Sequence, residues 1–359
     1  MVGRTASVLA RRAVFLSIAL VLIMILTAVI IGASGYDEEV LRAIIGTELQ
    51  AYRQALQRQN IPATKIQELV EQRKQELMHI YGLDKPWTAR VLPMAWRALK
   101  LDLGYVKSNA VADVVGKQPP LTVKDAILTV LPRTLVMLTV AELICAVIAL
   151  RLAPLIAYKR GSLLDKSVIA YAAFTNALPL WWLALIAVFV FGYELRIAPT
   201  DYRIIIKYIN EFTSNPIDAM KGIIEVSWLP VLVVVIGLLG GWLYGIRAIA
   251  IRVVNEDYVY VAKAKGVPEE LVVKRYILRV ILGPVLTIVI LALAGSIGGF
   301  IITESVFDWP GMGSLYYAAI ESGDAPTLIG LIYITTLVYI LARFLLEVIY
   351  ILVDPRVRY

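Results

Sequence analysis

The chain has 359 residues, 59% of them hydrophobic, and a formal net charge of +7 at pH 7. This composition is too apolar for an ordinary soluble domain and indicates an integral membrane protein. Apart from thirteen in the long segment 34–125, to which the loop-charge rule does not apply, the basic residues gather mainly in short segments beside apolar stretches, as in cytoplasmic loops, so the charge does not indicate nucleic-acid binding. The single cysteine, Cys145, lies inside an apolar stretch and excludes an intramolecular disulfide.

Six apolar stretches follow one another, and each approaches or exceeds the roughly 20 residues that a membrane-spanning helix needs. We therefore predict an all-α integral membrane protein with six transmembrane helices. The first stretch is longer than the apolar region of a cleaved signal peptide, which favours a retained span. The predicted spans are 13–33, 126–150, 167–192, 228–251, 281–303 and 327–353.

Lysine and arginine in the short loops predict the orientation. Segment 247–279 carries seven of them, whereas 304–326 has none and holds four acids. We expect a multi-pass protein of the cell (plasma or inner) membrane, in contact with membrane lipid, with both termini cytoplasmic. The chain then divides into an N-terminus with the first span at 1–33, an extracytoplasmic loop at 34–125, and a core of five spans at 126–359.

The extracytoplasmic loop contains two amphipathic series. Apolar residues recur at helical spacing over 41–56 and again over 66–80, with a break at Pro62. This pattern predicts an external helical hairpin, which is either a solvated decoration packed on the spans or a landing surface for an external protein. The only histidine, His79, has no neighbouring ligand residues, so we expect a surface residue and no metal site.

Segment 252–280 lies between the fourth and fifth spans and predicts two short amphipathic helices joined at a glycine. Asn255 is a good N-cap residue and is followed by two acids, which suit the first turn of a helix. Gly266 is suited to the C′ position that ends the first helix. Neither helix is long enough to cross a bilayer. A basic helix–glycine–helix between two spans predicts a docking surface for a soluble partner.

Segment 304–313, which we call the outer turn, follows the predicted fifth span. A proline and two glycines within four residues prevent helix there, and such backbone near membrane depth must be buried in protein or face a water-filled cavity. We expect Phe307 and Trp309 to anchor the turn at the membrane interface. The turn is either part of an external gate or an interfacial connection with no gating role. The gate candidates are Glu304, whose carboxylate we expect at the external mouth, and Trp309, Pro310 and Gly311.

No catalytic constellation is found along the chain. There is no Gly-x-x-x-x-Gly-Lys-Ser/Thr phosphate loop and no serine–histidine or cysteine–histidine arrangement, so we predict a non-catalytic protein without cofactor or metal. Glu142, in the middle of the second span, either lines a pathway or bonds a neighbouring helix. Arg133 lies near the outer end of that span, where it can extend to the interface, and Arg343 and Glu347 can pair at i,i+4.

Short motifs recur in one order along residues 81–359. They include Asp257-Tyr258-Val259 with Ala262-Lys263-Ala264-Lys265-Gly266, Leu131-Pro132 with Thr134, Arg160-Gly161-Ser162 with Asp165, Phe307-Asp308-Trp309-Pro310-Gly311-Met312-Gly313, and Asp354-Pro355-Arg356-Val357-Arg358-Tyr359. Together they resemble the permease subunits of binding-protein-dependent ABC importers, in the branch that carries peptides and nickel. Tyr260 stands where the wider family's Glu-Ala-Ala signature begins, and residues 36–80 match nothing in the resemblance.

The resemblance implies the type I ABC importer permease fold, with 252–280 as its cytoplasmic coupling loop. It implies two ATP-binding cassette ATPase subunits, a second related permease subunit and an extracytoplasmic solute-binding protein as partners. The ATPases would hydrolyse ATP, and this chain would supply half of the transmembrane pathway. The resemblance points to ATPase docking through Glu256 and Asp257 as the polar edge, Tyr258, Val261 and Ala262 as the apolar contact, and Gly266 as the turn.

The carried solute is less closely defined than the class of transporter. Di- or oligopeptide is the leading expectation and oligosaccharide the second. Nickel is the third expectation, and it is weakened because no histidine or cysteine cluster is present. An ion-coupled secondary transporter is the alternative from another class, but the halves 1–166 and 167–359 show no matching repeat.

Overall fold

The computed structural model describes residues 2–58 and 62–353, and in that part of the chain the regular structure is helical, with one isolated bridge between Tyr105 and Thr122. The predicted all-α class is confirmed. The terminal motif 354–359 lies outside the described residues. The helices are α1 (Val2–Ala33), α2 (Tyr36–Arg58), α3 (Ala63–Ile80), α4 (Trp87–Leu99), α5 (Asn109–Val115), α6 (Val123–Thr134), α7 (Val140–Tyr158), α8 (Leu163–Ala177), α9 (Leu180–Ala187), α10 (Ile205–Glu211), α11 (Pro216–Val254), α12 (Asp257–Ala264), α13 (Glu269–Leu271), α14 (Arg279–Ser296), α15 (Ile301–Val306), α16 (Met312–Ser322) and α17 (Ala325–Val353).

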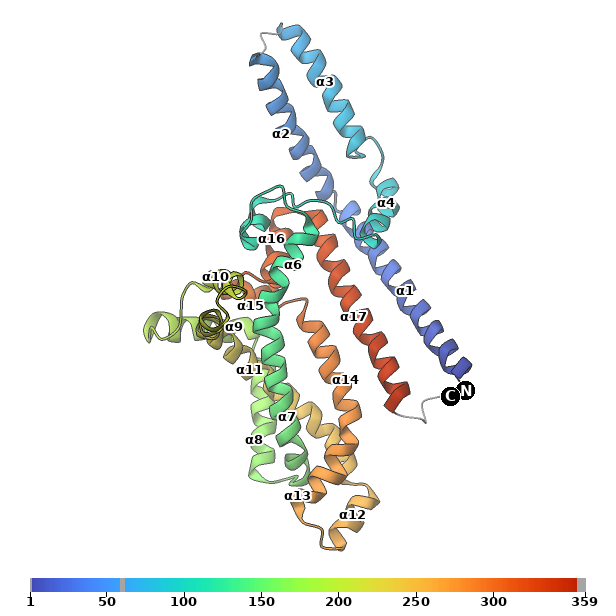
Figure 1. The fold of residues 1–359 in the computed structure, drawn as a ribbon, viewed down its shortest axis with the longest axis vertical. Helices are drawn as coiled ribbons and strands as arrows, with labels where there is room; N and C mark the ends of the chain where they lie inside the picture. Colours follow the sequence, from blue (N-terminus) through green and yellow to red (C-terminus); the bar gives the residue numbers. More distant parts are fainter. Residues whose placement is uncertain (1, 59–61, 354–359) are drawn as a thin grey trace.

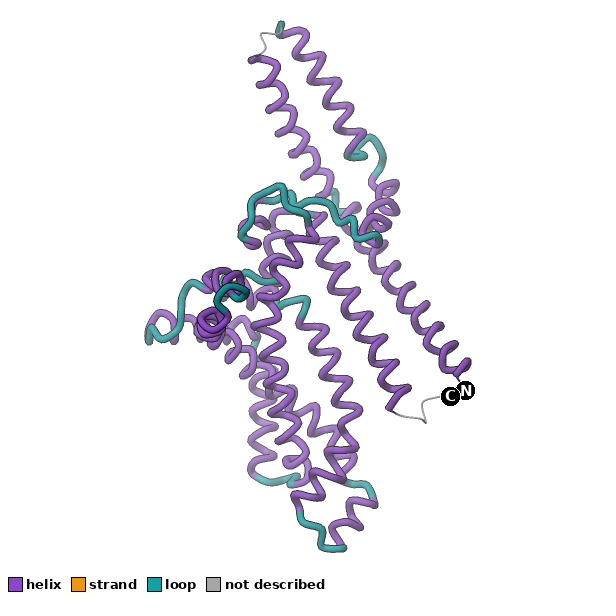
Figure 2. Tube along the Cα trace, viewed as in Figure 1, coloured by secondary structure: helices purple, strands orange, loops and turns teal. Residues whose placement is uncertain are grey.

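The helices form an elongated bundle (Figure 1). The α2–α3 hairpin projects from one end, and α12 and α13 lie at the opposite end. The first turns of α1 and the last turns of α17 point toward the α12 end. Loops lie at the base of the hairpin, around mid-height of the bundle and at the α12 end (Figure 2). Short non-α turns join or extend some helices: Leu135–Thr139, Val188–Glu194 and Val272–Leu278 are π-helical, and Tyr202–Ile204 is 3₁₀.

Within residues 2–58 and 62–353, five helical segments are long and apolar enough to cross a membrane, and a bent helix pair makes six if it is counted as one span. Six spans were predicted, and their number is confirmed on that count. The fourth begins earlier than expected, at Pro216, and the fifth ends earlier, at Ser296. The five are Leu9–Ala33, Val123–Tyr158, Pro216–Val254, Glu269–Ser296 and Ala325–Ile349.

The third span is bent by 90° between α8 and α9, so the prediction of one continuous helix over 167–192 is wrong. Pro179 has no backbone N–H, and its ring disfavours helical geometry at the residue before it. Leu178 accordingly takes extended backbone angles, with φ −96° and ψ 127°. The chain therefore leaves the helix at Leu178 and starts a new one at Leu180.

A helical hairpin lies where the sequence predicts one. α2 and α3 lie antiparallel and bury two small apolar clusters between them, one around Leu41 and Leu77 and one around Leu56 and Val70. Ile80, at the end of the second predicted apolar series, is 67% exposed and does not belong to either cluster. The hairpin thus has a core of its own.

The rest of the chain packs around three apolar clusters stacked along the bundle. The first joins α1, α4, α5, α6, α16 and α17 near the hairpin end. The second joins α7, α9, α10 and α11 to the outer turn. The third, which we call the inner cluster, joins α7, α8, α11, α12 and α14 at the opposite end. The helices that carry the two candidate sites therefore share one continuous body.

Gly240 brings α8 and α11 into close contact. A Cβ atom at this position would lie 2.2 Å from the Thr175 Oγ1 atom and 2.8 Å from the Ala172 Cα atom. Because the second of these is backbone, the two helices would have to separate.

We predict that Gly240→Ala lowers the unfolding free energy in detergent by about 1–3 kcal/mol, because overpacking forces the helices apart. The matched control is Gly245→Ala in the same helix, where an added Cβ meets nothing within 4 Å. Thermal unfolding of the two variants, followed by size-exclusion chromatography, compares them. Equal midpoints would show that α8 and α11 do not approach this closely.

Candidate functional site

The coupling loop forms the predicted helix–glycine–helix. α12 ends at Ala264, and Gly266 takes the left-handed conformation with φ +73°, so its predicted C′ position is confirmed. Its N–H donates to the Lys263 carbonyl at 2.9 Å. The predicted N-cap is wrong: Asn255 closes the end of α11, because that helix runs on to Val254, and Glu256 stands at the N-cap position without a side-chain capping bond.

The two faces of α12 have different surroundings. Val259 and Ala262 are 0% and 4% exposed and pack into the inner cluster. Tyr258, Tyr260 and Val261 are 41%, 74% and 47% exposed. The structure thus separates the three expected apolar contact residues: Ala262 faces the protein's own core, while Tyr258 and Val261 face outward beside Tyr260.

Two side-chain contacts hold the coupling loop against the end of α7. The Lys263 ammonium lies 4.3 Å from the centroid of the Tyr158 ring. The Lys159 ammonium lies 2.8 Å from the Glu269 carboxylate. The first contact involves α12 and the second involves α13, so both halves of the coupling loop are tied to the segment between α7 and α8.

A buried ion pair stands next to this segment. The Asp165 carboxylate in α8 accepts two bonds from the Arg247 guanidinium in α11, through Nε and, at 2.9 Å, through Nη2. Both side chains are at most 10% exposed. In the sequence, Asp165 stands out only as part of a motif, and Arg247 was not predicted as a site residue. The available signal was an arginine close to the end of an apolar stretch, which requires a partner when it is buried.

The outer turn is closed by a buried carboxylate. Glu304 is 0% exposed and accepts N–H bonds from Gly313 at 2.9 Å and from Phe300 at 3.3 Å, with the Thr134 hydroxyl at 3.4 Å. Burial, partly offset by these bonds, raises the pKa of Glu304 to about 8. The expectation of a carboxylate presented at an open mouth is therefore wrong, because the turn needs this side chain to satisfy its backbone.

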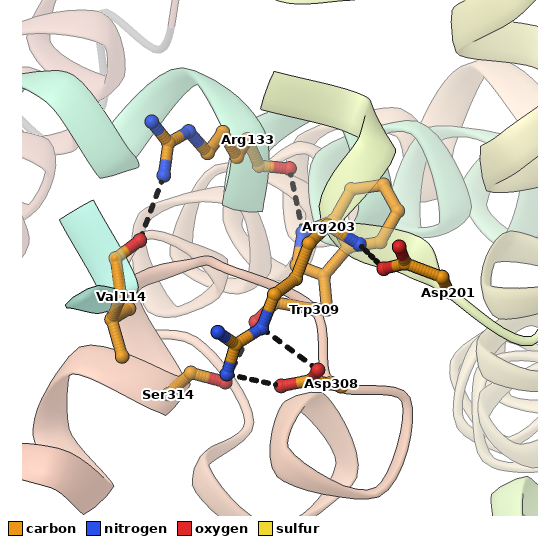
Figure 3. A network of polar contacts seen from close by, with 7 residues as sticks. All are labelled: Val114, Arg133, Asp201, Arg203, Asp308, Trp309 and Ser314. Atoms are coloured by element: carbon orange, nitrogen blue, oxygen red, sulfur yellow. Dashed lines mark hydrogen bonds and ion pairs between the residues drawn. The ribbon is translucent and has the colours of Figure 1, made fainter. Parts of the chain in front are cut away.

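The aromatic residues of the outer turn are buried instead of lying at an interface. Trp309 and Phe307 are 0% and 1% exposed. The Trp309 indole N–H donates to the Arg133 carbonyl at 3.1 Å (Figure 3). The Phe307 ring meets Tyr202 edge to face, with centroids 5.2 Å apart. The predicted interfacial anchor is wrong because the turn folds back into the bundle.

Arg133 is also buried, at 1% exposure, and does not extend to the membrane interface as expected. Its guanidinium donates to the carbonyls of Val114 at 3.0 Å, Val115 at 2.9 Å and Pro310 at 3.2 Å. The bond to Val114 and the indole bond to the Arg133 carbonyl are drawn in Figure 3. One arginine thus joins α5, α6 and the outer turn.

The four gate candidates lie together in this arrangement. A Cβ at Gly311 would lie 2.3 Å from the Glu304 Oε2 atom and 2.4 Å from the Thr134 Oγ1 atom, so only glycine fits there. The Pro310 carbonyl is held by Arg133 and the Trp309 indole by the Arg133 carbonyl.

The exposed side of the outer turn carries a separate ion pair. The Arg203 guanidinium donates to both carboxylate oxygens of Asp308, at 2.8 and 2.9 Å (Figure 3). These bonds raise the pKa of Arg203. The pair joins the turn to the segment before α10 at the surface.

Three further ionisable residues that the sequence singled out, Glu142, Glu347 and His79, have partners in the structure. The Glu142 carboxylate accepts the Trp242 indole N–H at 2.8 Å, so it bonds a neighbouring helix, one of the two predicted roles. Glu347 pairs with Arg12 of α1 at 3.7 Å, whereas the sequence predicted Arg343 as its partner. His79 is exposed and contacts Asp84 at 2.8 Å. In the described part of the chain, no group of three or more His, Cys, Asp or Glu could hold a metal ion.

The fold and the two sites define a multi-pass helical membrane protein with an exposed helix–glycine–helix at one end and a closed outer turn along the bundle. Residues 147–359 match the family model described as the inner membrane component of binding-protein-dependent transport systems. Since the match covers more than half of the chain, the protein belongs to this family and has the type I importer permease fold. Both the coupling loop and the outer turn lie within the matched residues.

Curated relatives match over a longer part of the chain. The oligopeptide transport system permease protein AppB of Bacillus subtilis is 28% identical over 287 residues, which cover 80% of this chain and 85% of the relative. The di/tripeptide transport system permease protein DppB of Pseudomonas aeruginosa is 29% identical over 303 residues, 79% of this chain and 84% of the relative. A putative peptide permease protein of Brucella suis is 29% identical over 277 residues, 77% and 82% of the two chains.

Proposed function

We propose that this chain is a transmembrane pathway subunit of an ATP-driven importer that takes di- or oligopeptides from an external binding protein into the cytoplasm. The family match supports the importer class, and the peptide permeases among the relatives support the solute. The chain itself carries no catalytic group in this proposal, and ATP is hydrolysed by two partner ATPase subunits. A second, related permease subunit completes the pathway.

The surface on which the ATPase docks is the outward face of this chain's coupling loop. Tyr258 and Val261, which the sequence indicated, lie there with Tyr260, and Glu256 and Asp257 form its exposed polar edge. Ala262 supports this face from behind and Gly266 shapes the turn. Exposed tyrosines suit such a role, since they add contact area with little loss of side-chain freedom. This exposed aromatic face beside a basic segment is the observation that carries the docking proposal.

The orientation follows from the same assignment. The coupling loop and the N-terminal end of α1 lie toward one end of the bundle, and the hairpin lies at the other (Figure 1). With the coupling loop in the cytoplasm, both termini are cytoplasmic and the hairpin is extracytoplasmic. The division of the chain into 1–33, 34–125 and 126–359 follows this orientation. The outer turn is then on the external side of the pathway, where we assign it to the external gate.

Reconstitution tests the proposed function. The chain, the second permease, the ATPases and the binding protein are combined in vesicles, and ATP hydrolysis and uptake are measured with peptide, oligosaccharide or nickel. We expect stimulation by peptide. Stimulation by oligosaccharide or nickel alone would identify that solute as the substrate instead of peptide. Uptake on an ion gradient without the ATPase would favour a secondary transporter.

In the same vesicles, Tyr258→Ala and Val261→Asp should lower both ATPase recovery and peptide uptake about tenfold, as expected for truncation of central interface residues. Gly266→Ala should act in the same direction but less strongly, because a non-glycine residue in left-handed geometry costs about 1–2 kcal/mol. Ile80→Ala, an exposed apolar residue on the hairpin side, is the control. Full recovery of the ATPase with all three coupling-loop variants would place the docking surface elsewhere.

Cysteine labelling tests the orientation. In a Cys145→Ala background, Lys265→Cys should react with an impermeant reagent only after the cytoplasmic side is opened. Lys74→Cys on the hairpin should react from outside in intact cells, because Lys74 is exposed. Labelling of Lys265→Cys from outside would reverse the orientation and remove the docking proposal.

For the outer turn, we predict that Trp309→Phe lowers peptide uptake. The phenyl ring fills most of the indole space but cannot donate to the Arg133 carbonyl, so the turn loses one buried hydrogen bond, which contributes about 0.5–1.5 kcal/mol. Uptake and thermal stability are measured together. The control is Trp96→Phe in α4, because the Trp96 side chain is exposed. Normal uptake by a Trp309→Phe protein of reduced stability would make the turn a structural element without a gating role.

A further inference from the structure

The Asp165 carboxylate combines three contacts at one point. It accepts the two bonds from Arg247, and its Oδ2 atom also accepts the Gly161 N–H at 2.9 Å. The Asp165 backbone N–H in turn donates to the Ser162 hydroxyl, which caps α8. One side chain therefore connects the α7–α8 segment, the start of α8 and the end region of α11.

The α7–α8 segment is also the part of the chain on which the coupling loop rests. The Tyr158 ring contacts the Lys263 ammonium, and the Lys159 ammonium pairs with the Glu269 carboxylate. Gly161, two residues further on, donates to Asp165. A continuous series of contacts thus runs from both coupling helices through residues 158–161 to the Asp165–Arg247 pair.

Beyond the pair, α8 and α11 are held together along the inner half of the bent span. Gly240 allows the two backbones to approach, and the Tyr171 hydroxyl donates to the Ile236 carbonyl at 2.5 Å. The α8 helix ends near Leu178, where the chain breaks before α9, and α9 packs on α11 separately, within the second cluster. A displacement of the Asp165–Arg247 pair would therefore move α8, which is the inner half of the bent span, together with α11.

We propose that the buried Asp165–Arg247 pair is the positioning contact that transmits movement of the coupling loop to the inner half of the bent α8–α9 span. The inference rests on the proposed function, since it concerns how ATPase docking reaches the pathway. A buried ion pair is weak evidence for stability, because apolar residues of similar volume often stabilise a protein as well or better. A two-bond guanidinium–carboxylate contact, by contrast, holds two helices in one relative position, which apolar packing does not specify.

The test separates transmission from stability in the reconstituted complex. The double variant Asp165→Leu with Arg247→Met replaces the pair by apolar side chains and leaves no unpaired charge. We expect it to assemble with the ATPase and keep basal ATP hydrolysis. Peptide-stimulated hydrolysis and uptake should fall about tenfold, within the usual range of coupling between distant sites. Arg247→Lys, which keeps the charge but not the planar fork, should retain an intermediate response.

The control is Arg97→Ala, which removes the exposed Arg97–Asp102 pair and should leave stimulation unchanged. Wild-type stimulation in the double variant would overturn the assignment. Failure of both the double variant and Arg247→Lys to assemble would also overturn it, because the pair would then be a folding contact. Absence of ATPase binding or peptide response in the wild-type complex would instead overturn the proposed function.

Discussion

The structure depends on one constraint: wherever the backbone leaves helical geometry in apolar surroundings, protein groups must satisfy its N–H and C=O groups. At the outer turn, the N–H groups of Phe300 and Gly313 are bonded by Glu304, and the Pro310 carbonyl is bonded by Arg133. This buried acid and this buried base each bond the backbone of the turn. Their hydrogen bonds thereby hold the turn in place, which explains why two ionisable residues are kept in the interior.

The sequence predicted those features that depend on local pattern. Apolar length identified the spans, helical spacing identified the hairpin, and the preference of glycine for left-handed backbone identified the turn at Gly266. Features that depend on neighbouring helices were not predictable in this way. Tryptophan at the end of a span suits an interface as well as a core, so the burial of Trp309 could not be read from its position. Likewise, the spacing of α12 grouped its apolar residues but did not show that Ala262 faces inward. The bend at Pro179 had a local signal, but the apolar length of the stretch concealed it.

The outer turn and the coupling loop use polar side chains differently. At the outer turn they are buried and bond the backbone, so that region is held by many short contacts that must break together. At the coupling loop, the contacts of Lys263 and Glu269 are with partly exposed side chains at the end of α7. Exposed contacts of this kind are individually weak. Among the described residues at that end, the Asp165–Arg247 pair is the ion pair that combines burial with two-bond geometry.

The hairpin also limits what can reach the spans from its side. α2 has 23 residues, which corresponds to a rod about 35 Å long, and it stands beyond the ends of the membrane helices (Figure 1). A flat surface approaching along the bundle axis would meet the hairpin tip well before it met the outer turn. Any protein that contacts the turn must therefore come in beside the hairpin and have a shape that accommodates it. The hairpin thus acts as a spacer that restricts the angle of approach, whatever its own side chains bind.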